Sequence, residues 1–438
     1  MLEWHILLLL IVGLLILFMV SGLPLAFCFI LSNLILASIS WGGQAGLEQL
    51  ILSTFSSLST QALLPLPLFI IMGEVISYSG IVPQMVEAID KWFGRLPGRL
   101  SLLAVVSGAL LAAITGVSMA SVAILGKVFV PEMQKRGYNK SLSIGPIMGA
   151  GGLATMIPPS VLAILVGSIG QISIGEILVA IILPGLLLAA VYASYILLRS
   201  FLQPSVAPPY GVSLPPIIDR ILFTIRYVLP IGFIIFLVVG VIFFGIASPT
   251  EAAALGAVGT FILVAVYGKL NWGMVKKAMI GSAEITVMLL FIIAGAATFS
   301  QLLAFTGASH GLVNFVVNLN MKPIFILIAM QVTLLIMGTF MDPVAMLMIT
   351  IPTYVPIIQT LGYNPVWFAV IILLNVEVAV ISPPFGILLY TMKGVAGPGT
   401  SMGDIIRASV PFVGLILLSM ALIIAFPALA LWLPRMMR

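Results

Sequence analysis

The stretch Met156-Ile157-Pro158-Pro159-Ser160 has a counterpart 225 residues later, in Ile381-Ser382-Pro383-Pro384-Phe385-Gly386. Three further pairs keep the same offset: Gly137-Tyr138-Asn139 with Gly362-Tyr363-Asn364, Pro131 with Pro356, and Pro24 with Pro249. A weaker match, at offset 222, relates Phe69-Ile70-Ile71-Met72-Gly73 to Phe291-Ile292-Ile293-Ala294-Gly295. Four anchors at one spacing indicate an internal repeat, so the chain consists of two related halves.

The composition places both halves in a membrane. Of the 438 residues, 62% are hydrophobic and only 7% are charged, and the mean hydropathy is +1.28. Such a chain has too little polar surface to coat a soluble globule and too many apolar residues to stay disordered. Its apolar runs exceed the roughly 9–11 residues of a membrane strand, so we predict an all-α membrane protein in a lipid bilayer.

The basic residues lie in short gaps between the apolar runs. The net charge of +5 is therefore explained by the positive-inside rule, and no nucleic-acid partner is expected. The single cysteine, Cys28, excludes an internal disulfide.

Ten apolar runs are long enough to span a membrane. They lie at about 4–20, 22–40, 100–126, 141–168, 174–198, 221–246, 249–268, 323–350, 364–390 and 408–433. Two further interrupted stretches, 50–80 and 283–308, are predicted to be re-entrant hairpins, and Pro65 and Pro67 break the first of them. The alternative is that both stretches are ordinary kinked spans.

These elements divide the chain into a first repeat (1–198), a Pro-rich linker (199–220) and a second repeat (221–438). Each repeat would hold about five transmembrane helices and one hairpin. Because five is odd, the second repeat enters from the opposite face, and the repeats have inverted topology. The bias of Lys and Arg places the linker in the cytoplasm and both termini outside.

Hydroxyl groups and glycines interrupt one apolar run in each half, at Thr115-Gly116-Val117-Ser118-Met119-Ala120-Ser121 and at Gly338-Thr339-Phe340-Met341-Asp342-Pro343. A helix broken at this depth exposes carbonyl oxygens at one end and N–H groups at the other. Carbonyl and hydroxyl oxygens suit a sodium ion, and helix N-termini suit an anion. The alternative is that these small residues only let helices pack closely.

The two Pro-Pro breaks also leave carbonyl groups without donors. In lipid, these carbonyls need a packed neighbour, water or a cation, although a simple structural kink is the alternative. No Lys or Arg lies mid-span beside the breaks, so an anionic cargo would be neutralised by bound cations and helix ends.

Several acids fall within or beside the membrane segments, where charge is expensive and usually functional. Asp342, at a helix break, is the preferred ionic ligand. Glu251 follows Ser248-Pro249-Thr250, a pattern typical of a helix N-terminal cap. The sequence leaves the roles of Glu74, Glu284 and Glu377 open.

The pattern predicts a transporter rather than an enzyme, because the sequence has neither a phosphate-binding loop nor a catalytic Ser–His or His cluster. A channel and a non-transporting scaffold are the alternatives from other classes. A channel would need a continuous wet path, and the helix breaks would serve no purpose in a scaffold.

The order of these motifs resembles that of the large membrane subunit of tripartite ATP-independent periplasmic (TRAP) transporters. The resemblance covers nearly the whole chain and depends on 64–73, the two broken runs, Ser248–Ala253 and the two Gly-Tyr and Pro-Pro elements. It implies a sodium-driven importer of the elevator type in the bacterial inner membrane. It also implies a small membrane partner subunit, a periplasmic substrate-binding protein and an organic-acid substrate. The runner-up is a stand-alone anion or dicarboxylate carrier of related architecture.

The resemblance further implies two Na+ sites, each formed where a broken helix meets a Pro-Pro loop. Their residues would be Thr115, Gly116, Ser118, Ser121, Ile157 and Pro158 in the first half, and Gly338, Asp342, Ser382 and Pro383 in the second. The candidate substrate path follows the same breaks through Thr155, Pro159, Ser160, Asn375, Glu377 and Pro384. Two residues depart from the family pattern: Val117 replaces a hydroxyl residue, and Glu377 stands where an apolar residue is usual.

Overall fold

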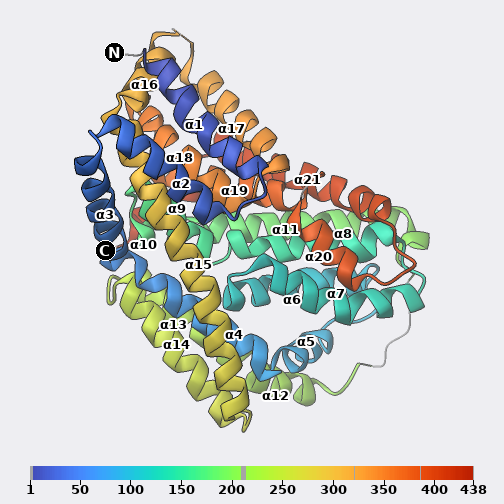
Figure 1. The fold of residues 1–438 in the computed structure, drawn as a ribbon. Helices are drawn as coiled ribbons and strands as arrows, with labels where there is room; N and C mark the ends of the chain where they lie inside the picture. Colours follow the sequence, from blue (N-terminus) through green and yellow to red (C-terminus); the bar gives the residue numbers. More distant parts are fainter. Residues whose placement is uncertain (1–2, 209–213, 320, 385, 438) are drawn as a thin grey trace.

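A computed structural model describes residues 3–208, 214–319, 321–384 and 386–437, and it is helical throughout these ranges (Figure 1). The described residues form 22 α-helices and three short 3-10 helices, η1 (Gln61–Leu63), η2 (Leu153–Thr155) and η3 (Pro204–Val206). Seven helices in this part of the chain are long and apolar enough to cross a membrane, or eight if a pair bent by 43° counts as one span. The prediction of an all-α membrane protein is confirmed.

The helices form two groups that alternate along the chain. The outer group contains α1 (Trp4–Val20), α2 (Leu25–Ser40), α3 (Gln44–Leu58), α4 (Pro65–Ser79), α5 (Val82–Asp90), α12 (Ile217–Tyr227), α13 (Leu229–Phe243), α14 (Pro249–Val266), α15 (Trp272–Phe305) and α16 (Ala308–Asn318). Within this group, α4 packs against α14 and α15, and α15 also packs against α2 and α3. Each group therefore takes helices from both halves of the sequence.

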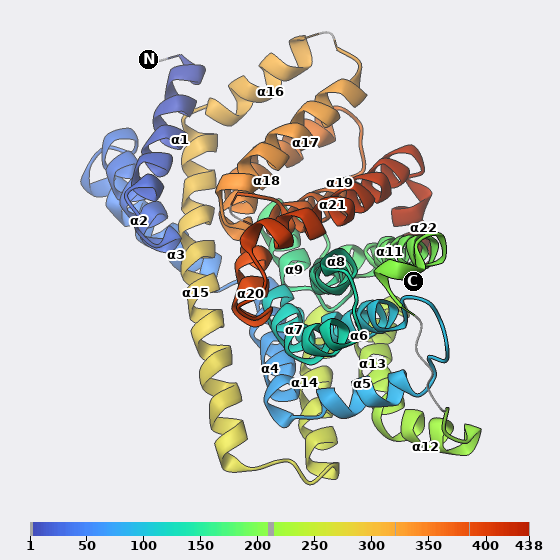
Figure 2. The same cartoon turned by 90° about the vertical axis from the view of Figure 1, so that its right-hand side faces the viewer.

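The second group, the hairpin bundle, contains α6 (Arg99–Thr115), α7 (Ser118–Lys135), α8 (Lys140–Gly152), α9 (Val161–Gly170), α10 (Ile174–Ala180), α11 (Ile182–Leu202), α17 (Pro323–Phe340), α18 (Pro343–Thr360), α19 (Pro365–Ile381), α20 (Ile387–Val395), α21 (Met402–Ala425) and α22 (Ala428–Met436). Helix α8 packs against α6, α7 and α21, and α19 packs against α17 and α21. Figure 1 shows α6, α7, α8 and α11 side by side, and Figure 2 shows α19 and α21 lying over them.

The repeated Gly-Tyr-Asn sequence ends one helix and starts the next. Gly137 and Gly362 have φ of 74° and 77°, a left-handed conformation that favours glycine. The Asn139 side chain then accepts a hydrogen bond from the backbone of Ser141 and caps α8, and Asn364 caps α19 in the same way. Helices α7 and α18 begin 225 residues apart, as do α8 and α19.

Both hairpins lie at positions that the sequence analysis assigned to spans. Helices α6 and α7 pack against each other across only Gly116 and Val117, and α17 packs against α18 across Met341 and Asp342. A connection of two residues between packed helices makes each pair an antiparallel hairpin. The predicted breaks within 115–121 and 338–343 are therefore confirmed, but they are hairpin tips rather than interruptions of a crossing.

The predicted hairpin at 283–308 is wrong. Residues 272–305 form one continuous helix, α15, because the small residues near Gly295 contain no proline and a helix tolerates them. The predicted hairpin at 50–80 is also wrong, although Pro65 does start a new helix. Among the described residues, α3 packs against α2 and α15, whereas α4 packs against α14, α15 and α6, so α3 and α4 do not pair.

The Pro-rich linker is only partly described. Residues 209–213, including Pro209, lie outside the described ranges, as does Phe385 of the second Pro-Pro motif. In the described part of the linker, η3 lies against α11, and the backbone N–H of Asn139 donates to the carbonyl of Val206 at 2.9 Å.

Candidate functional site

The tip of the first hairpin meets the first Pro-Pro loop inside the hairpin bundle. Gly116 ends α6 with φ of 59°, and a Cβ on it would lie 3.1 Å from the carbonyl oxygen of Pro159. The Pro158–Pro159 peptide bond is cis. Thr115, Pro158 and Pro159 are buried. The structure thus brings together the first set of predicted site residues, namely Thr115, Gly116, Ser118, Ser121, Thr155, Ile157, Pro158, Pro159 and Ser160.

Hydroxyl groups form hydrogen bonds within the tip and, separately, within the loop. Oγ1 of Thr115 lies 3.2 Å from Oγ of Ser121 and donates to the carbonyl of Leu111 at 2.9 Å. Oγ of Ser160 donates to the carbonyl of Thr155 at 3.0 Å and accepts from the backbone N–H of Ala163, which caps α9. The hydroxyl groups that the sequence singles out therefore hold the two turns in shape.

Glycines on neighbouring helices let main-chain oxygens of this region approach closely. A Cβ on Gly73 of α4 would lie 2.6 Å from the carbonyl oxygen of Thr115, and one on Gly185 of α11 would lie 2.3 Å from that of Met156. Any side chain at these positions would push the turns away, because such contacts are far below van der Waals distance. Gly73 is thus the point where the outer group touches the first tip.

The second tip lies near the second Pro-Pro loop but is more open. Gly338 is not in the turn: it lies within α17, where a Cβ would be 2.5 Å from that of Ala379 in α19. Oδ1 of Asp342 accepts from the N–H of Val344 at 2.8 Å and caps α18. Asp342, Pro383 and Pro384 are exposed and Ser382 is buried, so the two half-sites differ in burial.

Glu377 and Asn375 face different neighbours from the middle of α19. Glu377 is buried between Tyr192 of α11 and Thr155 of η2, next to the first Pro-Pro loop. The Nδ2 of Asn375 donates to the main-chain and side-chain oxygens of Gln331 in α17, at 2.9 and 3.0 Å. Asn375 therefore ties α19 to the second hairpin.

The donor groups of the first half-site fit a monovalent hard cation. The carbonyl of Ala112 accepts from the N–H of Gly116, whereas the carbonyls after it have no donor further along the helix, because α6 ends there. The Thr115 and Ser121 hydroxyls belong to the same turn. Oxygen donors of this kind, from unwound backbone, coordinate Na+ in broken-helix transporters. The described residues contain no group of three or more His, Cys, Asp or Glu side chains for a transition metal.

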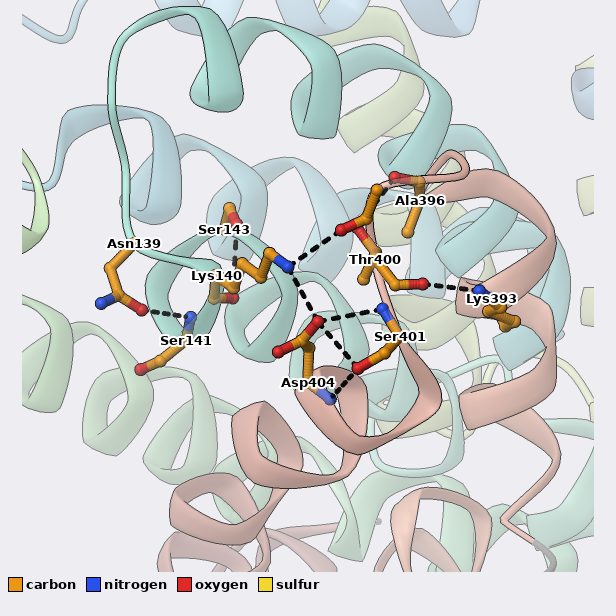
Figure 3. Close-up of polar contacts among 10 residues, drawn as sticks. Asn139, Lys140, Ser141, Ser143, Lys393, Ala396, Thr400, Ser401 and Asp404 are labelled. Atoms are coloured by element: carbon orange, nitrogen blue, oxygen red, sulfur yellow. Dashed lines mark hydrogen bonds and ion pairs between the residues drawn. The ribbon is translucent and has the colours of Figure 1, made fainter.

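A polar cluster connects the two halves of the hairpin bundle at the start of α8 and α21 (Figure 3). Nζ of Lys140 donates to the Gly399 carbonyl at 2.9 Å and to the Asp404 carboxylate at 2.8 Å. Asp404 also accepts from the backbone and hydroxyl of Ser401 in a capping box. Helices α8 and α21 also pack against each other, so this cluster holds their first turns together.

Two cavities lie where the hairpin bundle meets the outer group. One, of about 560 Å³, is apolar and lies between Pro158 and α13, with Phe236 and Phe243 in its wall. The other, of about 810 Å³, has mixed polar and apolar walls from the α9–α10 and α13–α14 turns, including Gln171 and Ser248. The boundary between the two groups therefore contains open space on both an apolar and a partly polar side.

The sequence is matched by the family model described as "Tripartite ATP-independent periplasmic transporter, DctM component", over residues 12–429. The chain belongs to this family. It is therefore the large permease component of a TRAP transporter, a multi-pass membrane protein and not an enzyme, as the sequence resemblance indicates.

Curated TRAP relatives match along nearly their full length. The C4-dicarboxylate TRAP transporter large permease protein DctM of Rhodobacter capsulatus is 31% identical over 452 residues, covering 98% of this chain and 99% of that protein. The protein of the same name from Pseudomonas aeruginosa is 30% identical over 388 residues, covering 88% and 89%. Among solved structures, the YdaH transporter of Alcanivorax borkumensis has a similar fold, with a TM-score of 0.68, 15% identity and coverage of 93% and 97%.

Sequence reasoning missed several residues of this TRAP permease site. Gly73 ends the Phe-Ile-Ile motif that occurs in both halves, so the repetition of this motif could have identified Gly73 as a candidate site residue. Gly185 and Tyr192 carry no local signal, because each meets its partner only through the packing of α11. The Ser248–Glu251 cap was predicted, and the structure confirms it as a capping box.

Proposed function

We propose that this TRAP permease imports a small organic anion of the carboxylate class, driven by sodium, through an elevator motion of the hairpin bundle. The observation that carries the proposal is the meeting of a hairpin tip and a cis Pro-Pro loop inside that bundle. The same pair of elements occurs again in the second half, but there it is exposed.

Sodium coupling follows from the donors that the two turns offer. In the first half-site the ion would be held by Thr115, Ser121 and main-chain oxygens of residues 115–118 and 157–158. In the second it would be held by Asp342, Ser382 and main-chain oxygens near 338 and 383. A bound cation acts as the partner of main-chain oxygens that would otherwise have no hydrogen-bond donor in the lipid.

The anion would lie between the two turns of the first half. Helices α7 and α9 both begin there, at Ser118 and Val161, and helix N-termini attract negative charge. No ion pair of the described residues involves a base at either tip. Cargo binding would therefore depend on sodium, because the helix ends alone leave most of the negative charge unbalanced.

The elevator motion is supported by the unequal surroundings of the two tips. The first tip is docked on α4 at Gly73, whereas the equivalent glycine of α15, Gly295, packs on Phe29 of the outer group. The second tip is exposed. In a transporter built from two inverted repeats, the inward-open and outward-open states exchange the surroundings of the two equivalent elements. In the other state the first tip would therefore leave Gly73 and become exposed, and the second tip would pack against α15.

The remaining components follow from membership of a tripartite family. We infer a small membrane subunit, a periplasmic substrate-binding protein that delivers the cargo, and location in the bacterial inner membrane. The C4-dicarboxylates named for the two DctM relatives make this class the first cargo to test.

Reconstituted transporter tests the coupling. Liposomes that hold the permease with its small subunit would be supplied with binding protein and labelled succinate, with and without a sodium gradient. Uptake that requires both sodium and the binding protein supports the proposal. Uptake without sodium refutes the coupling, and uptake without the binding protein supports a stand-alone carrier instead.

A disulfide between the two helix groups tests the motion. Gly175 of α10 faces Ile242 of α13, with a Cβ position 3.4 Å from the Ile242 Cγ2. In a Cys28→Ala background, Gly175→Cys with Ile242→Cys should crosslink on oxidation, stop uptake, and regain uptake on reduction. Full uptake in the crosslinked protein would exclude movement between these groups.

A further inference from the structure

The carboxyl group of Glu377 is enclosed in the interior of the hairpin bundle and has no part in the proposed sodium sites. The residue has 0% exposure. Its Oε1 accepts from the hydroxyl of Tyr192 at 3.1 Å, and its Oε2 lies 3.4 Å from Oγ1 of Thr155. These partners come from α11 and η2, so Glu377 joins the second half of the chain to the first.

The backbone of α8 leaves room for this carboxyl group. A Cβ on Gly152 would lie 2.8 Å from Oε1 of Glu377 and 2.9 Å from its Cγ. Any larger residue at 152 would therefore push the acid aside. The absence of a side chain at Gly152 and the two hydroxyl groups together accommodate the carboxyl group.

Within the described ranges, no positively charged side chain forms an ion pair with Glu377. Of the titratable groups on the elements around α19, only Tyr192 is within hydrogen-bond distance. The others are Lys140, Glu176, Tyr195, Arg199, Tyr354, Tyr390, Lys393, Asp404, Arg407 and Arg435. An unpaired carboxylate at such a position is costly, and such groups usually become neutral.

The hydrogen-bond geometry also fits a neutral carboxyl group. The single proton of the Thr155 hydroxyl has two acceptors, the Gly152 carbonyl at 3.1 Å and Glu377 Oε2 at 3.4 Å. If it goes to the nearer carbonyl, Oγ1 of Thr155 faces Oε2 as an acceptor. A protonated Oε2 can donate to it, whereas a carboxylate has no donor.

We propose that Glu377 is a proton-binding site of the hairpin bundle, which holds its proton while α19 is packed against α8 and α11. The proton comes from water and returns to water when that packing opens, and the carboxyl group is then the carboxylate. Coupling of this exchange to transport rests on the proposed function; the protonation itself does not.

Infrared spectroscopy of the full-length chain in lipid nanodiscs tests the protonation without any cargo. At neutral pH the wild type should show a carbonyl band of a neutral carboxyl group that Glu377→Gln lacks. Glu284→Gln, which removes an exposed acid of α15, should keep the band. Tyr192→Phe should keep it at a shifted frequency, because Oε1 loses its donor. A Glu377→Gln spectrum identical to that of the wild type would overturn the proposal, and so would an unshifted band in Tyr192→Phe.

Uptake as a function of pH tests the coupling. A single required proton makes wild-type uptake fall about tenfold per pH unit above the midpoint of the titration. Glu377→Gln, a permanent neutral mimic, should vary less than about twofold over that range. Parallel pH profiles of the two proteins would overturn the coupling. Sodium-independent uptake with the infrared band present would instead refute only the proposed sodium drive.

Discussion

The substitution Gly73→Ala should destabilise the state in which the first hairpin tip packs on α4, relative to the other state of the proposed elevator motion. In the structure a Cβ on Gly73 would lie 2.6 Å from the carbonyl oxygen of Thr115 and 3.0 Å from its Cα. These are backbone atoms, so no flexible side chain can move out of the way. To restore an ordinary contact, the first hairpin tip must retreat by roughly 0.8 Å, which is an overpacking strain.

The size of the effect follows from measured costs of overpacking, about 1–3 kcal/mol. The strain acts only while the tip is docked on α4, so Gly73→Ala should shift the population away from this state by about 5–150-fold. The assay is the rate of disulfide formation between Gly175→Cys and Ile242→Cys, which reports the same docked state. That rate should fall, and by the whole of this factor where the docked state is the less populated of the two.

Two alanine substitutions serve as controls. Gly259→Ala meets only Ile234 at 3.6 Å, an ordinary contact, and should leave the crosslinking rate unchanged. Gly295→Ala collides with Phe29 inside the outer group, so it should lower thermal stability without changing the rate. If Gly73→Ala crosslinks as fast as Gly259→Ala, the tip does not leave α4 and the reasoning about docking is refuted.

Substitutions at three other residues test the half-sites and the cluster of Figure 3. Asp342→Ala should insert normally, abolish sodium-dependent uptake and lower stability by about 1 kcal/mol through loss of the α18 cap. Asp342→Asn should keep the cap but also abolish the uptake. Unchanged uptake in either variant would exclude Asp342 from the site. Thr115→Val should weaken apparent sodium affinity about tenfold, or ~1.4 kcal/mol, in a sodium titration of uptake; an unchanged titration curve would exclude its hydroxyl as a ligand. Asp404→Ala should lower the melting temperature, because Lys140 and the α21 cap lose their partner, while the sodium dependence of uptake stays as in the wild type.

Local signals predicted the breaks and caps of this protein well. Pro158–Pro159 and Pro383–Pro384 stop helices wherever they occur, and the Ser248–Glu251 cap is formed within four residues. The two Gly-Tyr-Asn motifs were readable for the same reason, because each ends one helix and caps the next. These features depend on neighbours in sequence, which is why the sequence was enough.

The hairpins were misplaced because a hairpin and a span have the same composition. The apolar run around Gly116 has no sequence signal that predicts that α7 turns back along α6. The turn is determined by the packing of both helices against α8. Gly338 was assigned to the second break, but that break lies at Met341 and Asp342, so Gly338 falls inside α17. Contacts such as Tyr192–Glu377, 185 residues apart, are fixed by tertiary structure alone.

The interleaving of the two halves in each helix group has a consequence for biogenesis. Helices α6 to α9 leave the ribosome well before α19, which supplies Glu377, and α21, which holds α8 through Asp404. At about 5–20 residues per second, the delay of some 225 residues is roughly 10–45 s. For that time the nascent first half sits in the translocation machinery or the bilayer with its polar turns uncovered, so an insertase or chaperone that shields them would determine the yield of assembled permease.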